Sequence, residues 1–407
     1  MPAPVRVLFL THRLPFAPNR GDRLRAWHIL AHLRAEGCET HLVSLAHDRA
    51  EAQRSGDLGD LTASVRVAPL GVAHRAVSVA SAFMTDTPLT HALLHSRKTT
   101  RQVASAVGQH APDVILAYCS SMARYALEPP LAGRPLVIDM VDADSAKWAD
   151  LADKRPWPLS WVYAREARLL GAFEAVAMRT AGATLAVNER ERQMLADLAP
   201  DARIEVVPNG VDLERFMPEG PPAARAQVVF TGVMDYAPNV EGALWLGQHV
   251  WPLVRATRPD ARLEIVGANP ARAVRSLHAP GFGIEVTGTV PDVRPHLWGS
   301  AVAAAPLHTA RGVQNKVLEA VAAGLPCVVT TAVWEGLPDE VRPACTLADT
   351  PQAFADAVLG LLAMTPPERR AIPNRANLAQ LRWQARLATL VPILREAARR
   401  PEGLRYR

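Results

Sequence analysis

Two charged side chains, Lys316 and Glu319, are placed so that one ligand could meet both. They stand three residues apart in a segment that reads as one helix of about ten residues, so they share a helix face. A lysine in the first turn opposes the helix dipole, and an anion held between its ammonium and the free amides would explain its position. The pattern predicts an anionic ligand here; a solvated surface cation is the alternative for Lys316.

The segments around this helix predict how a ligand approaches it. Residues 301–307 and 326–331 are apolar runs, short enough to be buried strands before and after the helix. Together they form a strand–loop–helix–strand unit of a parallel α/β sheet, in which ligands bind beyond the carboxyl ends of the strands. We therefore expect the loop that carries His308 and Gly312 to face the binding site.

A second candidate for phosphate contact lies near the N-terminus. Residues 5–10 predict a strand, Gly21 marks a loop, and Asp22 fits the N-cap of a helix that ends near residue 36. A glycine loop between a strand and a helix suggests a turn that faces phosphate at Gly21. Four arginines of this region are candidates to face a ligand, with solvation as the alternative: Arg13, Arg20, Arg23 and Arg25.

Three acidic residues, Asp139, Asp142 and Asp144, follow or end a predicted strand at 134–140. Their spacing suggests a metal site, but no glycine or later glutamate completes a calcium loop, so we expect no metal. A carboxylate at this strand end could accept hydrogen bonds or a proton. These acids would otherwise cap a helix, with Asp144 capping the segment that begins at Ser145.

Strands and helices alternate along most of the 407 residues, which predicts parallel sheets and more than one core. A strand near residue 205 stops at Pro208, and the Pro- and Ala-rich stretch 218–226 reads as a linker. A new strand at 227–231 opens the second half. Pro252 should kink or end the helix after that strand. A final long helix is expected at 377–399.

These segments resemble retaining glycosyltransferase family 4, whose GT-B fold joins two Rossmann-like domains across a cleft. The family signature runs Glu-x7-Glu into Ala-x-Ala-x-Gly-x-Pro-Val-Val. Glu319 matches the second Glu, which holds the nucleotide ribose, while Arg311 replaces the first. A hallmark Pro-Asn-Gly-Val-Asp begins at Pro208. The expected parts are an N-terminal acceptor-side domain (1–205), a linker (206–226), a nucleotide-sugar-binding domain (227–380) and a crossing helix with its tail (381–407).

The resemblance fails at the cations that usually hold the diphosphate. The family places an Arg after the glycine that matches Gly232, and a Lys further on, whereas this chain has neither. Asn239 lies near the Lys position and fits an N-cap that would leave amides for phosphate. We expect Lys316 and Arg311 to replace the missing cations as a clamp on the diphosphate. Solvation in a loop is the alternative for Arg311.

Further contacts are implied by the same resemblance. The loop of Gly21 would close over the donor diphosphate, and the backbone around Val290 would meet the nucleobase. The loop of His308 and Gly312 would supply groups to the donor sugar. The family carries a polar residue, often His, beside the donor sugar at the end of the strand at 134–140. Asp142 is the counterpart here, with Asp139 as the alternative, and would bind that sugar or accept the proton of the acceptor.

The implied reaction moves a sugar from a UDP- or GDP-linked donor to an acceptor hydroxyl with retained configuration, without cofactor or metal. Glycan or lipid-linked acceptors are expected, because details such as Gly-Asp-Arg-Leu-Arg are similar to exopolysaccharide sugar transferases of the PEP-CTERM/exosortase system. A nucleotide-sugar epimerase and a catalytically silent GT-B subunit are the rival interpretations. An NAD-linked enzyme is excluded, since no Gly-x-Gly-x-x-Gly follows a strand.

Composition limits the kinds of partner and the cellular location that the sequence predicts. The net charge of +5 is spread without a basic block, so nucleic-acid binding is not expected. No apolar run is long enough for a bilayer span and no signal region opens the chain, which predicts a cytoplasmic protein. The stretch 155–163 holds two Trp and one Tyr beside Lys154 and Arg155. It reads either as a peripheral contact with the inner membrane face or as ordinary packing of a long helix.

Overall fold

The computed structural model describes residues 4–16, 21–70, 82–218, 220–221, 223–310 and 313–399. It divides into two compact units. Unit 1 comprises Met1–Pro208 with Leu387–Arg407, and unit 2 comprises Asn209–Arg386. The predicted linker therefore falls with unit 2 from Asn209 onward.

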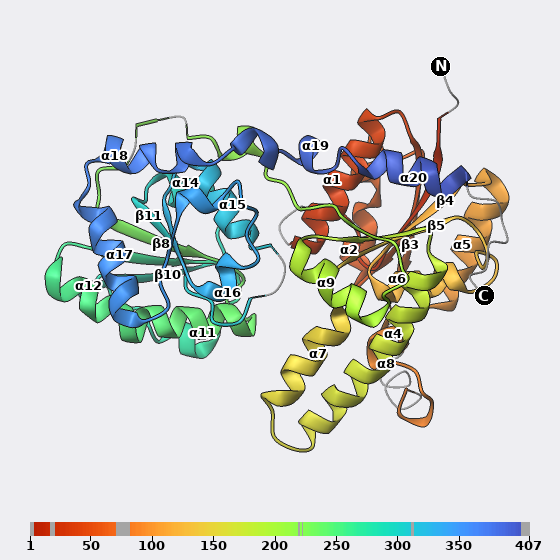
Figure 1. Ribbon diagram of the computed structural model, residues 1–407, viewed down its shortest axis with the longest axis horizontal. Helices are drawn as coiled ribbons and strands as arrows, with labels where there is room; N and C mark the ends of the chain where they lie inside the picture. The colour runs from red at the N-terminus through yellow and green to blue at the C-terminus, as the bar shows by residue number, and fades with distance from the viewer. Residues whose placement is uncertain are drawn as a thin grey trace. The chain divides into compact units, whose positions relative to one another are not determined.

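Unit 1 is built on seven parallel strands in the order β3-β2-β1-β4-β5-β6-β7 (Figure 1). In the central register Phe9 of β1 lies opposite Leu42 on one side and Leu116 on the other, and all three are buried. These continuous apolar runs are what a sheet covered on both faces requires. The strands are β1 (Arg6–Thr11), β2 (Glu39–Ala46), β3 (Ser64–Pro69), β4 (Val114–Tyr118), β5 (Leu136–Val141), β6 (Ala183–Ala186) and β7 (Ile204–Val206).

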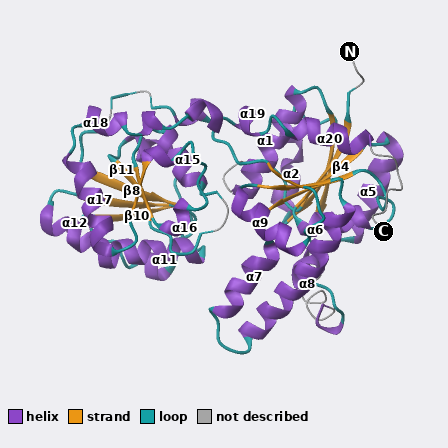
Figure 2. Cartoon of the chain, in the orientation of Figure 1, coloured by secondary structure: helices purple, strands orange, loops and turns teal. Residues whose placement is uncertain are grey.

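Helices flank this sheet, as Figure 2 shows. Two of them, α7 and α8, pack along each other as a hairpin. The helices of unit 1 are α1 (Gly21–Ala35), α2 (Arg49–Gln53), α4 (Leu89–Leu94), α5 (Arg97–His110), α6 (Ser120–Leu127), α7 (Asp144–Asp153), α8 (Leu159–Thr180), α9 (Glu189–Leu198) and α20 (Leu390–Arg399).

Unit 2 repeats the plan with six parallel strands in the order β10-β9-β8-β11-β12-β13. The strands are β8 (Gln227–Thr231), β9 (Arg262–Val266), β10 (Ile284–Gly288), β11 (Val302–Ala305), β12 (Cys327–Val329) and β13 (Cys345–Leu347). The longer helices are α11 (Ala237–Trp245), α12 (Trp251–Thr257), α15 (Asn315–Ala322), α17 (Pro351–Ala363) and α18 (Pro366–Ala371). The short ones are α10 (Leu213–Phe216), α13 (Arg272–Arg275), α14 (Arg294–Trp298), α16 (Thr331–Trp334) and α19 (Trp383–Arg386).

The two sheets share one topology. In each, the first strand of the unit lies centrally. The second and third strands are added on one side of it and the fourth and later strands on the other, so the direction of strand addition reverses between the first and the fourth strand, which is the Rossmann order. The reversal falls between β1 and β4 in unit 1 and between β8 and β11 in unit 2. The predicted fold class, α/β with two Rossmann-like domains, is confirmed.

Two predicted helices differ from the structure. Pro252 does not end its helix; a π-helical turn at Leu246–Val250 precedes α12, and the proline fits the first turn of α12. The long helix expected at 377–399 is broken into a 3₁₀ turn at Leu378–Leu381, α19 in unit 2, and α20, which packs against β4 and β5 of unit 1. None of the helices in the described ranges is both long and apolar enough to cross a membrane.

Candidate functional site

The candidate donor site lies where β8 and β11 of unit 2 end. Gly232 follows β8, and a Cβ on it would lie 2.8 Å from the Asn239 side-chain nitrogen, so only glycine admits Asn239 here. A Cβ on Gly242 would lie 2.9 Å from the carbonyl oxygen of Pro306, which holds α11 close to the loop after β11. These close approaches bring three loop and helix segments to the switch point, where ligands of such sheets bind.

Lys316 is anchored at this point. Its Nζ donates to Asn239 Oδ1 at 2.5 Å and lies 5.0 Å from the centre of the Phe230 ring. Asn239 in turn donates from Nδ2 to the carbonyl oxygen of Val233 at 2.9 Å. The expectation that Asn239 is an N-cap is wrong, because the cap position is taken by Tyr236 and Asn239 lies inside the first turn of α11. Its side chain instead fixes the ammonium.

Burial controls the charge of both motif residues. It lowers the pKa of Lys316 to about 7, against the opposing effect of Glu319. Burial likewise raises the pKa of Glu319 to about 7, although Arg215 and Lys316 both favour its ionised form. Arg215, on the short helix α10, is a cation that the sequence analysis missed. A diphosphate beside Lys316 would restore its positive charge.

The other predicted donor contacts also follow strand ends. His308 comes after β11, is exposed, and meets Trp245 edge to face with ring centroids 4.7 Å apart. Val290 lies half-buried in the turn after β10. Arg311 and Gly312 lie outside the described residues. The carboxyl-edge arrangement thus includes Lys316, Asn239, Gly232, His308 and Val290.

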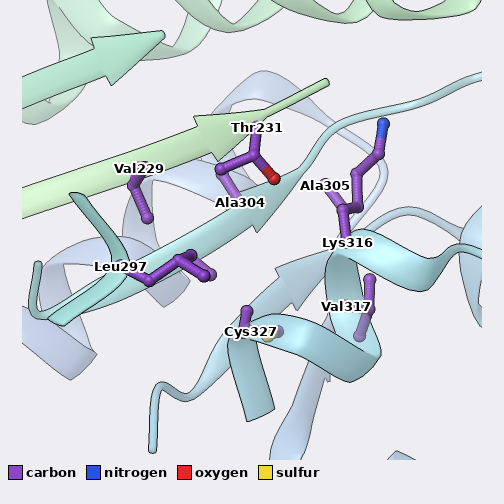
Figure 3. Close-up of a pocket in the computed structure, with 10 residues that line it drawn as sticks. Val229, Thr231, Leu297, Ala304, Ala305, Lys316, Val317 and Cys327 are labelled. Atoms are coloured by element: carbon purple, nitrogen blue, oxygen red, sulfur yellow. The ribbon is translucent and has the colours of Figure 1, made fainter. Parts of the chain in front are cut away.

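Two hollows in unit 2 need to be distinguished from this site. Figure 3 shows the first, with a cavity volume of about 10 Å³, where Lys316 runs past Ala305 and the apolar walls include Val229 and Cys327. Apart from Lys316 and Thr231 its walls are apolar, so it cannot hold a diphosphate. The second, with a cavity volume of about 310 Å³, lies at the amino ends of β8, β9 and β10, beside Arg262. Although this hollow is the larger of the two, it lies away from the carboxyl ends of the strands, where Lys316 and Asn239 meet.

In unit 1, Asp142 follows β5 immediately after Val141, whose φ of 65° is rare for a β-branched residue. Burial raises the pKa of Asp142 to about 7, with Glu191 and Asp144 adding to the effect. A carboxyl group poised near neutrality can accept a proton. Strained backbone and a perturbed acid at one strand end support a functional position.

The alternative, Asp139, is excluded by its partner. Arg25 of α1 binds it through Nε at 2.8 Å and Nη2 at 3.1 Å, and both side chains are buried. Arg25 is therefore a core residue and not the ligand-facing cation that its position suggested. Arg23 is likewise paired, with Glu51 at 3.0 Å. Gly21 begins α1, and Arg20 lies outside the described residues.

Helix capping at α7 also differs from the expectation for Asp144. Helix α7 begins at Asp144 itself, with Ala143 at the cap position and no side-chain cap from it. Buried glutamates of other helices bind the amides at the start of α7 instead: Glu191 accepts a hydrogen bond from the Ala143 amide at 2.9 Å, and Glu174 accepts one from the Ser145 amide at 3.2 Å.

The sequence analysis missed a pair at the switch point of unit 1. His12 follows β1 and Cys119 follows β4, with 3.3 Å between Nδ1 and Sγ. The Cys119 backbone has a φ of 66°, and the His12 ring stacks on Tyr118 with centroids 5.7 Å apart. Both residues are half-buried. Strand order, unknown from sequence, is what brings them together.

Two Rossmann-like units, with perturbed charges at the carboxyl ends of their strands, define a protein of the GT-B class. Residues 24–215 match the family described as Glycosyltransferase Family 4, and residues 225–364 match Glycosyl transferases group 1. The chain therefore carries the two glycosyltransferase domains of this class. Within the described ranges, no three His, Cys, Asp or Glu side chains gather as a metal ion would require.

Solved structures show the same fold. Sucrose-phosphate synthase from Thermosynechococcus elongatus superposes with a TM-score of 0.70 at 15% identity, covering 96% of this chain and 98% of that chain. Anabaena HepE in complex with UDP and glucose gives 0.62 at 15%, over 96% and 100%. A UDP-forming α,α-trehalose-phosphate synthase from Burkholderia xenovorans gives 0.62 at 14%, over 97% and 100%. No curated protein sequence matches this chain.

Proposed function

We propose that the protein transfers a sugar from a UDP- or GDP-linked donor to an acceptor hydroxyl, with retained configuration. The observation that carries the proposal is the Lys316 ammonium, held by Asn239 beside Gly232 at the ends of β8 and β11. Glu319 follows one turn later, where its carboxylate can accept from ribose hydroxyls. UDP in the HepE complex favours a uridine donor as the first to test.

Lys316 would stabilise the departing diphosphate. Negative charge grows on the leaving group as the sugar–oxygen bond breaks, and an ammonium already in place lowers that barrier without reorganisation. The amides at the start of α15 add to the same effect. This chemistry requires no metal. Arg311, outside the described residues, is proposed as the second cation of the clamp.

Asp142 is proposed as the group that receives the acceptor proton or hydrogen-bonds the sugar. Its pKa of about 7 lets it be ionised before transfer and protonated after it. The resemblance to exopolysaccharide and PEP-CTERM/exosortase sugar transferases suggests a glycan or lipid-linked acceptor. We place the reaction in the cytoplasm, with peripheral contact at the inner membrane face.

The donor is tested by thermal shift with UDP-glucose, other UDP-sugars, GDP-mannose and ADP-glucose, with NAD as control. One nucleotide sugar should raise the melting temperature, and Glu319→Ala should abolish the rise. Lys316→Ala should lower turnover more than it lowers affinity for the nucleoside. Lys98→Ala, at an exposed lysine of unit 1, serves as the matched control.

The rival functions predict different products. An epimerase would change the donor sugar without any acceptor, and a silent subunit would bind the donor without turnover. Release of nucleoside diphosphate that depends on an added acceptor supports transfer. Binding with no product under any acceptor, or an acceptor-independent new epimer, would contradict it.

A further inference from the structure

Helices α7 and α8 form a hairpin whose turn exposes large apolar side chains. Figure 1 shows the two helices running side by side away from the sheet of unit 1. At the turn, Trp157 is 80% exposed, and Leu159 and Trp161 at the start of α8 are 47% and 55% exposed. Ordinary packing of a long helix, one of the two expectations for this stretch, does not account for these three residues.

A neighbouring segment extends the same apolar surface. Phe83 and Met84 are 43% and 88% exposed, and the Phe83 ring stacks on Trp161 with centroids 6.3 Å apart and planes at 12°. Arg165 of α8 fixes this segment, since its Nη2 donates to the carbonyl oxygens of Ala82 at 2.5 Å and Thr85 at 2.6 Å. The five apolar residues are called the hairpin tip: Phe83, Met84, Trp157, Leu159 and Trp161.

Basic side chains lie near the hairpin tip. Lys154 and Arg155, both exposed, directly precede the tryptophan turn. Arg168 is exposed on α8, seven residues after Trp161 on the same helix face and about 10 Å further along the axis. Asp86 and Asp153 are exposed as well, so the basic excess is small. Aromatic side chains at the end of a projection, with cations beside them, match the composition of a membrane interface.

We propose that the hairpin tip docks the protein on a membrane surface that contains anionic lipid. The apolar side chains sit on the turn, on the start of α8 and on the neighbouring segment, and a bilayer accepts such a projection, whereas a protein partner would need a matching groove. Trp157 and Trp161 would enter the headgroup boundary, while Lys154 and Arg155 meet lipid phosphates. This inference locates the membrane contact of the proposed function, but it concerns unit 1 and needs no donor.

Vesicle flotation of the full chain tests the proposal. Vesicles of phosphatidylcholine with about 30% phosphatidylglycerol should carry the protein, and pure phosphatidylcholine should carry less. Trp157→Ser with Trp161→Ser should reduce binding about tenfold or more, because most of the inserted apolar surface is lost. Met84→Ser should reduce it, whereas the matched control Met364→Ser, at an exposed methionine of unit 2, should not.

Further variants separate the contribution of charge to membrane binding from that of the apolar side chains. Lys154→Glu with Arg155→Glu should weaken binding to the anionic vesicles and reduce its salt dependence. Every variant should keep the thermal shift given by the donor sugar, so that loss of vesicle binding is distinct from loss of donor binding. Absence of wild-type binding to anionic vesicles would overturn the proposal. So would a wild-type dimer in solution that the double tryptophan variant converts to a monomer, because a second copy would then cover the tip.

Discussion

Donor affinity should pass through a maximum near pH 7. Lys316 and Glu319 both have pKa values of about 7 in the empty site, but the ligand needs opposite protonation states of them. The diphosphate needs the Lys316 ammonium, which is lost as the pH rises through 7. The ribose hydroxyls need the Glu319 carboxylate, which is lost as the pH falls through 7. Affinity should therefore fall on both sides.

The slope of donor affinity against pH follows from the linkage between proton binding and donor binding. Where one proton must be taken up or released on binding, affinity changes at most tenfold for each pH unit, which is about 1.4 kcal/mol. Because each group is already half in the wrong state at pH 7, the loss between about pH 7 and pH 8.5 should be roughly eightfold, and the full tenfold slope is reached only at higher pH. The diphosphate of a nucleotide sugar keeps its charge over this window, so the protein is the source of the effect.

Isothermal titration calorimetry with UDP-glucose and GDP-mannose measures both the affinity and the proton count, the latter from buffers of different ionisation enthalpy. Lys316→Met should lower affinity at neutral pH and remove the alkaline slope, while Glu319→Gln should remove the acid slope. Lys98→Met should leave the profile unchanged. A pH-independent affinity, or an alkaline slope that survives in Lys316→Met, would refute the assignment of this lysine to the diphosphate.

Three further predictions concern folding stability and the packing around the candidate donor site. Arg25→Met leaves Asp139 as an uncompensated buried charge and should cost roughly 3–5 kcal/mol in denaturant unfolding, while adding Asp139→Leu should recover most of it. Burial raises the pKa of Glu174 to about 8, and the nearby charge of Asp144 adds to the effect. The folded state therefore holds a proton that the unfolded state has lost, so the free energy of unfolding should fall as pH rises from about 4.5 to 8. Glu174→Gln should flatten that dependence in pH-resolved melts. Gly232→Ala should cost about 1–3 kcal/mol and weaken donor binding in calorimetry, because its Cβ displaces the Asn239 side chain; unchanged binding would place the donor elsewhere.

The parts of the fold set by local pattern could be predicted. Each central strand is an apolar run, and the Lys316–Glu319 spacing fixes one helix face wherever that helix packs. The pairing of side chains could not be predicted, because it depends on strand order. Lys316 and Asn239 are 77 residues apart. Only the adjacency of β8 and β11 at the switch point explains why their elements meet.

Two of the wrong predictions, the Asn239 N-cap and the unbroken helix at 377–399, are contradicted by prolines in the sequence itself. Pro238 fits the first turn of a helix, so α11 must begin before it, and that places Asn239 inside the helix and not at its cap. Pro392 has no amide hydrogen for a bond four residues back, so a helix running from 377 through it would be broken there. The structure places Pro392 in the first turn of α20. In these two helices the proline position locates the helix start better than the capping preference of Asn or the apolar period.

The repeated topology bears on where the acceptor half of the site should be sought. In unit 2 the switch point between β8 and β11 coincides with the sequence motif, so local pattern and strand order agree on Lys316. In unit 1 they point to neighbouring places, since the pattern selects Asp142 after β5 and the switch point selects His12 and Cys119 after β1 and β4. Because β4 and β5 are adjacent, these residues belong to one sheet edge. Asp142 supplies a group that can take a proton, and the His12 ring, with Nδ1 3.3 Å from Cys119 Sγ, lies at the same edge.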